Sequence, residues 1–173
     1  AATAAAVQVS LFSLPDGSGK TLDAAKAQAD PVSVDATVTL TLRDGNDDPI
    51  SAYPGEDIEM ASTLGGFVAC AGGAAADAST DAAGLTTFSG SFNAGGFSAA
   101  GEMAVVTVDG LPLVGSNLNI LFNSADLDAS GLVDLSDAVT FSTAYQGVYD
   151  YKVDFFFDGS LSLSDIVLFA GGY

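Results

Sequence analysis

The C-terminal part of the sequence contains two copies of one segment, and this duplication constrains the fold more than any other feature. The copies are "DLDASGLVDLSDAVTFSTAY" (residues 126–145) and "DFFFDGSLSLSDIVLFAGGY" (residues 154–173). Each copy begins with an acidic stretch that contains a glycine, Gly131 or Gly159, and continues into an apolar stretch. An internal repeat indicates one structural unit present twice, with the two units packed against each other.

Each acidic stretch is predicted to lead into a short helix. Ser136 and Ser164 lie where the helix N-caps are expected, because a serine side chain accepts hydrogen bonds from the free N–H groups of the first helical turn. Apolar residues beyond each cap are expected to form the buried face of the helix. They include Val139, Phe141, Val167 and Phe169. The two helices are therefore expected to pack as a pseudo-symmetric pair.

The acidic stretches have the spacing of calcium-binding loops, which place oxygen ligands at positions 1, 3, 5, 7, 9 and 12 and glycine at position 6. The first copy has an oxygen donor at every ligand position: Asp126, Asp128, Ser130, Leu132 through its carbonyl, Asp134 and Asp137. The second copy offers Asp154, Asp158, the Ser160 carbonyl, Ser162 and Asp165. Phe156 stands at its position 3, which is a ligand position. The spacing predicts two calcium ions, with the second site weaker or completed by other groups.

An alternative explanation is that these aspartates only solvate turns and stabilise helix N-termini. Two loops in one register favour calcium over this alternative. The charge balance agrees, because 22 acidic against four basic residues give a net charge of -18, and bound cations relieve such self-repulsion. Since helices this short are marginal alone in water, the ions are expected to be structural.

Two other acidic stretches are weaker candidates. "RDGNDDP" (Asp44, Asp47, Asp48) can hold an ion, but Asp, Gly and Asn are also what a hairpin turn needs, and the turn is favoured. "PGEDIE" (Glu56, Asp57, Glu59) can pair carboxylates for glycoside hydrolysis, yet a solvated strand edge is favoured because no second acidic element accompanies it. Histidine, the commonest general base, is absent. We therefore do not expect an enzyme.

From Val7 to about Phe122 the sequence predicts short strands separated by turns. The clearest strand is "DATVTLTL" (residues 35–42), in which apolar residues alternate with threonines, as in a strand with one face in a core. Many short strands at near-regular spacing are typical of a β-sandwich. No apolar run approaches the about 20 residues of a membrane-spanning helix. The acidic balance disfavours nucleic acid and anionic membranes as partners.

Two families resemble parts of the chain. "ATVTLTLRDGNDDPISAYPGEDIEM" and "STDAAGLTTFSGSFNAGG" resemble the bacterial immunoglobulin-like domains of adhesins and invasins, over roughly residues 33–110. The duplicated loops, each ending in Asp and followed by one helix, resemble the dockerin family over about residues 123–173. The second resemblance implies a module that binds two calcium ions and docks onto a partner β-sandwich, as dockerins dock onto cohesins.

The expected fold is mainly β, with three parts. Residues 1–12 form an N-terminal arm or first strand, residues 13–122 an immunoglobulin-like β-sandwich, and residues 123–173 a small α-helical dockerin-like module with EF-hand-type calcium loops. Cys70 is expected to be a small buried core residue.

Residues expected to meet a partner come from the repeat. The dockerin resemblance places the partner-reading pairs at Leu135 with Ser136 and at Leu163 with Ser164. Three consecutive aromatic residues, Phe155, Phe156 and Phe157, cannot all be hidden on one side of a strand or loop. At least one of them is expected to face a partner surface, either the sandwich of its own chain or another molecule.

The expected function is structural. The start "AATAAAV" is typical of a mature N-terminus left by signal-peptide cleavage, so a secreted, extracellular or cell-surface protein is expected. A head-to-tail contact between the module of one copy and the sandwich of the next would yield a filament. The arm can add as a strand to a neighbour or be the first strand of its own sandwich. The alternative is a cellulosome-like anchoring module that binds a separate cohesin-type partner.

Overall fold

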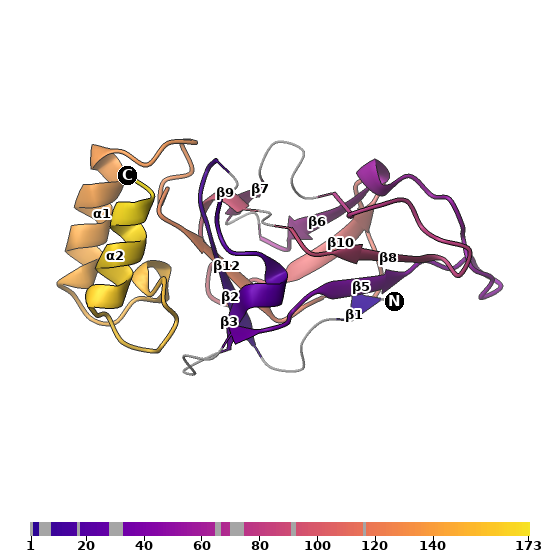
Figure 1. Ribbon diagram of the computed structural model, residues 1–173, viewed down its shortest axis with the longest axis horizontal. Helices are drawn as coiled ribbons and strands as arrows, with labels where there is room; N and C mark the ends of the chain where they lie inside the picture. Colours follow the sequence, from indigo (N-terminus) through magenta and orange to yellow (C-terminus); the bar gives the residue numbers. More distant parts are fainter. Residues whose placement is uncertain are drawn as a thin grey trace.

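Strands make up one end of the molecule, and two helices lie side by side at the other (Figure 1). The computed structural model describes residues 2–3, 8–16, 18–27, 33–64, 67–69, 75–90, 93–115 and 117–173. Cys70 and residues 4–7 of the predicted arm lie outside these ranges. Within the described part of the chain, neither helix is long and apolar enough to cross a membrane. The prediction of a mainly-β chain is confirmed.

The strands are arranged in several sheets. Their bounds are β1 (Ala2–Thr3), β2 (Val9–Ser13), β3 (Ala25–Ala27), β4 (Ser33–Val34), β5 (Val38–Thr41), β6 (Ile58–Ser62), β7 (Phe67–Ala69), β8 (Leu85–Phe88), β9 (Asn93–Gly96), β10 (Ala104–Val108), β11 (Leu111–Pro112) and β12 (Ile120–Ser124). The sheet orders are β1-β5-β8, β11-β10-β6, β12-β2-β3-β4 and β7-β9. The pairing of β2 with β12 is parallel, and the other pairs of these strands are antiparallel.

The described parts of the predicted arm belong to the chain's own sheets. β1 pairs with β5, with Ala2 opposite Leu40, and β2 runs beside β12, with Val9 opposite Ile120. This pairing agrees with the alternative in which the arm is the first strand of its own sheets. Strand addition to a neighbouring molecule stays a prediction.

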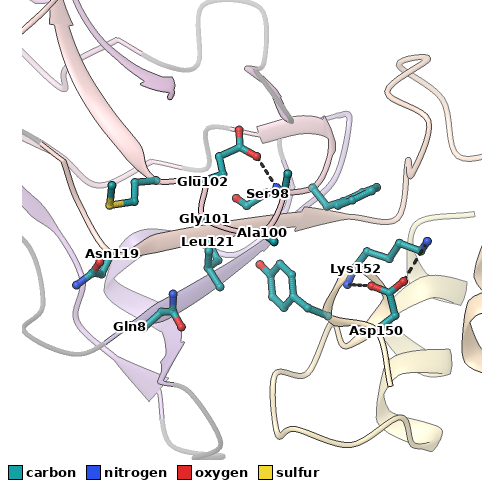
Figure 2. Close-up of a pocket in the computed structure, with 13 residues that line it drawn as sticks. Gln8, Ser98, Ala100, Gly101, Glu102, Asn119, Leu121, Asp150 and Lys152 are labelled. Atoms are coloured by element: carbon teal, nitrogen blue, oxygen red, sulfur yellow. Dashed lines mark hydrogen bonds and ion pairs between the residues drawn. The ribbon is translucent and has the colours of Figure 1, made fainter. Parts of the chain in front are cut away.

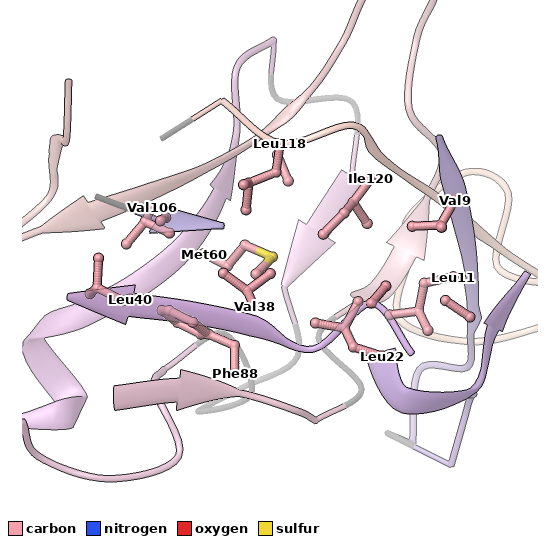
Figure 3. Close-up of a cluster of buried hydrophobic side chains, with 14 of the residues drawn as sticks. Val9, Leu11, Leu22, Val38, Leu40, Met60, Phe88, Val106, Leu118 and Ile120 are labelled. Carbon is pink, nitrogen blue, oxygen red and sulfur yellow. The ribbon is translucent and has the colours of Figure 1, made fainter. Parts of the chain in front are cut away.

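Side chains from most of the longer strands converge on one core (Figure 3). The predicted alternation in residues 35–42 is confirmed, because Val38 and Leu40 on β5 are fully buried while Thr39 and Thr41 are partly exposed. Full burial of one such aliphatic side chain contributes about 1.5–3 kcal/mol. We call residues 2–124, as far as they are described, the β region.

A second core joins the helices α1 (Leu135–Tyr145) and α2 (Leu163–Gly171) to the β region. The rings of Phe141 and Phe169 stack with centroids 4.5 Å apart, which holds the two helices together. Phe12, on β2, reaches into the same core, and its ring centroid lies 4.9 Å from that of Phe155. We call residues 125–173 the helical segment. Phe12 therefore connects the core of this segment to strand β2 of the β region.

The three consecutive phenylalanines all contact their own chain. Phe155 and Phe157 are buried, and the partly buried Phe156 lies against the Lys26 side chain of β3. Of the two surfaces that the sequence left open for these residues, the geometry favours the chain's own β region.

Candidate metal centre

The first acidic loop (residues 126–137) brings three carboxylates together. Ligand oxygens of Asp126, Asp128 and Asp137 all lie within 4.8 Å of one another. Asp126 and Asp137 are fully buried, whereas Asp128 is exposed. Among the described residues, no other group of three or more acidic or cysteine side chains meets this spacing.

Backbone N–H groups hold the two buried carboxylates of the first loop in place. Asp126 accepts hydrogen bonds from the N–H groups of Ser130 at 3.0 Å and Gly131 at 2.7 Å. Asp137 accepts from Leu127 at 2.7 Å and from Asp134 at 2.9 Å. Gly131 has φ +89°, a conformation that favours glycine and explains its place at the sharp turn. The loop is therefore shaped around its first and last aspartates.

The other predicted metal ligands of the first loop, Ser130, Leu132 and Asp134, take part in different hydrogen bonds. The Ser130 hydroxyl donates to the Leu132 carbonyl at 3.2 Å. The Asp134 carboxylate accepts from the backbone N–H of Ser136 at 2.7 Å and so caps α1. The structure thus brings Asp126, Asp128 and Asp137 together and uses Asp134 as a helix cap.

The predicted N-caps were wrong by two residues. Asp134 caps α1 and Ser162 caps α2, each in a capping box with the aspartate three residues later, Asp137 or Asp165. Because the helices begin at the leucines that follow these caps, Ser136 and Ser164 lie inside the first turn and donate N–H groups to the cap side chains.

The predicted apolar stripes were also partly wrong. Phe141 and Phe169 are buried as expected, but Val139 and Val167 are 60% and 62% exposed. In both helices the valine stands two residues before the phenylalanine, which is about 200° around a helix, so the two side chains face opposite sides.

The second acidic loop (residues 154–165) repeats the backbone network of the first. Asp154 accepts from the N–H groups of Asp158 at 3.2 Å and Gly159 at 3.0 Å. Asp165 accepts from Phe156 at 2.9 Å and from Ser162 at 2.8 Å. Asp154 and Asp165 are fully buried, like their counterparts Asp126 and Asp137. The duplication seen in the sequence is therefore a duplication of structure.

The side chains around the second loop differ from those around the first. The hydroxyl of Tyr149 donates a hydrogen bond of 2.7 Å to Asp154 Oδ2. Phe156, at the third loop position, lies under the Lys26 Nζ, which is 4.5 Å from the ring centroid. Ser160 donates its hydroxyl proton to Asp158 at 2.6 Å. Sequence analysis missed Tyr149, although a tyrosine five residues before the first loop aspartate was a visible difference between the copies.

Burial and like charge act on the carboxylates of both loops. Burial raises the pKa of Asp126 and of Asp154 above the ordinary aspartate value, and hydrogen bonds to each carboxylate act in the opposite direction. The charge of Asp137 raises the pKa of Asp126 further. Burial also raises the pKa of Tyr149, and its bond to Asp154 adds to that rise, so the phenol stays a proton donor.

The donor set of the first loop suits a hard divalent cation. Neither the ion pair Arg43–Asp47 nor the ion pair Lys152–Asp150 involves Asp126, Asp128 or Asp137. Buried carboxylates without a basic partner carry a desolvation cost that a cation with oxygen ligands offsets. The residues of the first loop therefore have the chemistry to hold a hard divalent cation, without indicating which one.

The weaker acidic candidates have ordinary structural roles. Asp44 accepts from the N–H groups of Asn46 and Asp48 at 2.8 and 3.0 Å, which is a side-chain-stabilised turn, as favoured from the sequence. Glu56 and Glu59 are exposed, on a short 3-10 turn (Gly55–Asp57) and on β6. Neither stretch gathers carboxylates in the way the first loop does.

A cavity of about 530 Å³ lies between the β region and the 3-10 turn η3 (Tyr151–Val153) (Figure 2). Several of its charged groups already have partners. Glu102 accepts a hydrogen bond from the backbone N–H of Ala99, and Lys152 Nζ lies 3.1 Å from Asp150 Oδ2. We therefore place the candidate functional site at the acidic loops.

Comparisons with protein-family models, curated proteins and solved structures find no match to this chain. The resemblances to immunoglobulin-like domains and to dockerins therefore stay predictions.

Proposed function

We propose that the chain is an extracellular structural protein whose first acidic loop binds calcium and whose exposed helix faces join copies of the chain. The observation that carries this proposal is the cluster of Asp126, Asp128 and Asp137, with oxygens within 4.8 Å and two members fully buried. Three carboxylates so close repel one another, and a bound calcium ion offsets this repulsion because it attracts all three. Calcium then holds the loop and the start of α1 folded.

The finer fold assignment belongs to the same proposal. We interpret the β region as an immunoglobulin-like sandwich and the helical segment as a dockerin-like module. The parallel pair of β2 with β12 supports the first interpretation, since it places the start and end of the β region side by side. Two acidic loops with matching networks, each followed by one capped helix, support the second.

The helices offer an apolar surface to a partner. Leu135 and Leu163, at the starts of α1 and α2, are 69% and 70% exposed, and Val139 and Val167 lie one turn further along each helix. The same residue types therefore recur at matching places on both helices. A groove of about 340 Å³ beside α2 is lined by Phe156, Leu163, Ser164, Val167 and Leu168. Exposed apolar residues grouped in this way mark an interaction surface.

The occupant that we propose for this surface is the β region of a second copy. The net charge of -18 opposes contact between copies, so such a contact needs an apolar surface together with a bound cation that lowers the repulsion. The helix faces supply the apolar surface and the first loop supplies the cation site. Contacts that run head to tail without closing build a filament.

Assembly is expected to depend on both calcium and the helix surface. In sedimentation velocity experiments, the full chain should form large particles in calcium and stay small in excess chelator. The double variant Leu135→Asp/Leu163→Asp should stay small in calcium, because its new charges face the apolar contact. The control Val148→Asp, at a 90% exposed site between α1 and the 3-10 turn η3, should assemble normally. A wild-type chain that stays monomeric in calcium would favour a separate cohesin-type partner instead.

Asp126→Asn is expected to weaken calcium binding by more than the roughly 10–100-fold that loss of an outer-shell partner costs. The change keeps the shape of a fully buried ligand but removes its charge. Isothermal titration calorimetry with calcium measures the effect. The control Asp47→Asn removes an aspartate from the exposed "RDGNDDP" turn and should leave the affinity unchanged. Equal effects of the two variants would contradict the assignment of the site.

A further inference from the structure

The two acidic loops share one backbone network but differ in the side chains that meet the first aspartate. In the first loop, Asp128 stands two residues after Asp126 and adds a third carboxylate to the cluster. In the second loop, Phe156 occupies the matching position. All residues of this loop are described by the structure, and no three of its carboxylates come as close together as those of the first loop. The second loop therefore has less negative charge and one ligand fewer.

The Phe156 side chain is directed toward the β region. Lys26 Nζ lies 4.5 Å and Lys20 Nζ 5.9 Å from the centroid of its ring. These are two of only four basic residues in the whole sequence. An ammonium group over an aromatic face is attracted by the ring, most strongly where water is excluded, and Lys26 is buried. The position that supplies a ligand in the first loop thus supplies a contact with the β region in the second.

Tyr149 occupies the other side of the second loop. Its hydroxyl donates to Asp154 Oδ2 at 2.7 Å, a hydrogen bond strengthened by the charge of the carboxylate. That oxygen also accepts from the Gly159 N–H at 3.0 Å. In the first loop, the residue five positions before Asp126 is Leu121, which has no hydroxyl. The buried Asp154 is therefore stabilised by a neutral donor that its counterpart lacks.

We propose that the second loop is a metal-independent copy, in which Tyr149 and the contact of Phe156 with Lys26 replace the calcium ion of the first loop. The repeat then binds one calcium ion, not two. The second copy stays docked on the β region at all times, and only the first copy depends on calcium. This inference rests on the proposed function only in taking the first loop as the calcium site.

The first test counts calcium ions by calorimetry on the full chain and on two matched variants. Wild type is expected to bind one ion in the repeat, Asp126→Asn none and Asp154→Asn one, because the two variants change the same loop position. Two ions in wild type, with one lost in Asp154→Asn, would overturn the inference and leave the proposed function intact. No ion in wild type would overturn the proposed function and, with it, this inference, which takes the first loop as the calcium site.

The second test follows amide hydrogen exchange in excess chelator. Gly131 and Gly159 donate equivalent hydrogen bonds to Asp126 and Asp154, at 2.7 and 3.0 Å. The Gly159 amide is expected to stay protected without metal, whereas the Gly131 amide is expected to lose protection. Loss of protection at Gly159 on chelation would overturn the inference.

A gain of binding provides a third test. The double variant Tyr149→Phe/Phe156→Asp removes the neutral donor and restores the third acidic side chain, so it is expected to bind a second calcium ion. Asp154→Asn added to this variant should abolish the second ion. If the double variant still binds a single ion, Tyr149 and Phe156 are not the residues that exclude it.

Discussion

Gly95→Ala is expected to weaken calcium binding to the first loop, although Gly95 lies in β9, far from the loop in sequence. A Cβ atom at this position would lie 2.5 Å from Asp126 Oδ2 and 2.9 Å from Ala129 Cα. The neighbouring Gly96 N–H donates to the Asp126 carbonyl at 2.7 Å, which ties the loop to the strand. The added methyl group must therefore displace the carboxylate or the loop backbone.

Overpacking of this kind costs about 1–3 kcal/mol. If that cost falls on the calcium-bound geometry, the affinity falls by about one to two powers of ten. Calorimetry with calcium on the full chain measures the loss. The expected result would connect a residue of the β region directly to the metal site.

Gly45→Ala is the matched control for this prediction. Gly45 lies in the exposed "RDGNDDP" turn, and a Cβ atom there would meet nothing within 4 Å. Its calcium affinity is expected to equal that of wild type. If Gly95→Ala also binds calcium with wild-type affinity, the loop has room to move away from β9, and the contact does not fix the ligand.

Local patterns predicted the parts of the molecule that depend on neighbours in sequence. The period of two in residues 35–42 predicted which face of β5 is buried, because alternation alone decides which side chains enter a core. The loop register included the three aspartates that come together around the turn at Gly131, but it also included Asp134, which caps α1 instead. The N-caps were missed because Asp134 was assigned only as a ligand, and a cap and a ligand can be the same residue.

Contacts between distant segments could not be predicted from these patterns. Phe12 had the appearance of an ordinary strand residue, and nothing near it indicates that its ring completes the core of the helical segment. In the sequence, Gly95 resembles an ordinary turn glycine. Only the structure shows that Asp126 lies against it and leaves no room for a Cβ atom. Glycines carry no chemical group that signals a partner, so sequence patterns say little about such close approaches.

Phe12→Ala is expected to lower the free energy of unfolding of the helical segment by about 3–5 kcal/mol. Phe12 is 5% exposed, and its ring lies against Phe155 in an aromatic core that also contains Phe141 and Phe169. A loss of this size is a large part of the about 5–15 kcal/mol by which a typical domain is stable. Urea unfolding in calcium, followed by the helical circular dichroism signal, measures the change.

Phe88→Ala separates this effect from a general loss of stability. Phe88 is fully buried in the core of the β region and does not belong to the second core. Because the helical segment is docked on the β region through Phe12, Phe88→Ala should lower the unfolding midpoints of both parts. Phe12→Ala should lower mainly the midpoint of the helical signal, since the β region keeps its own core. An unchanged helical midpoint in Phe12→Ala would mean that the helical segment is stable without its contact to β2.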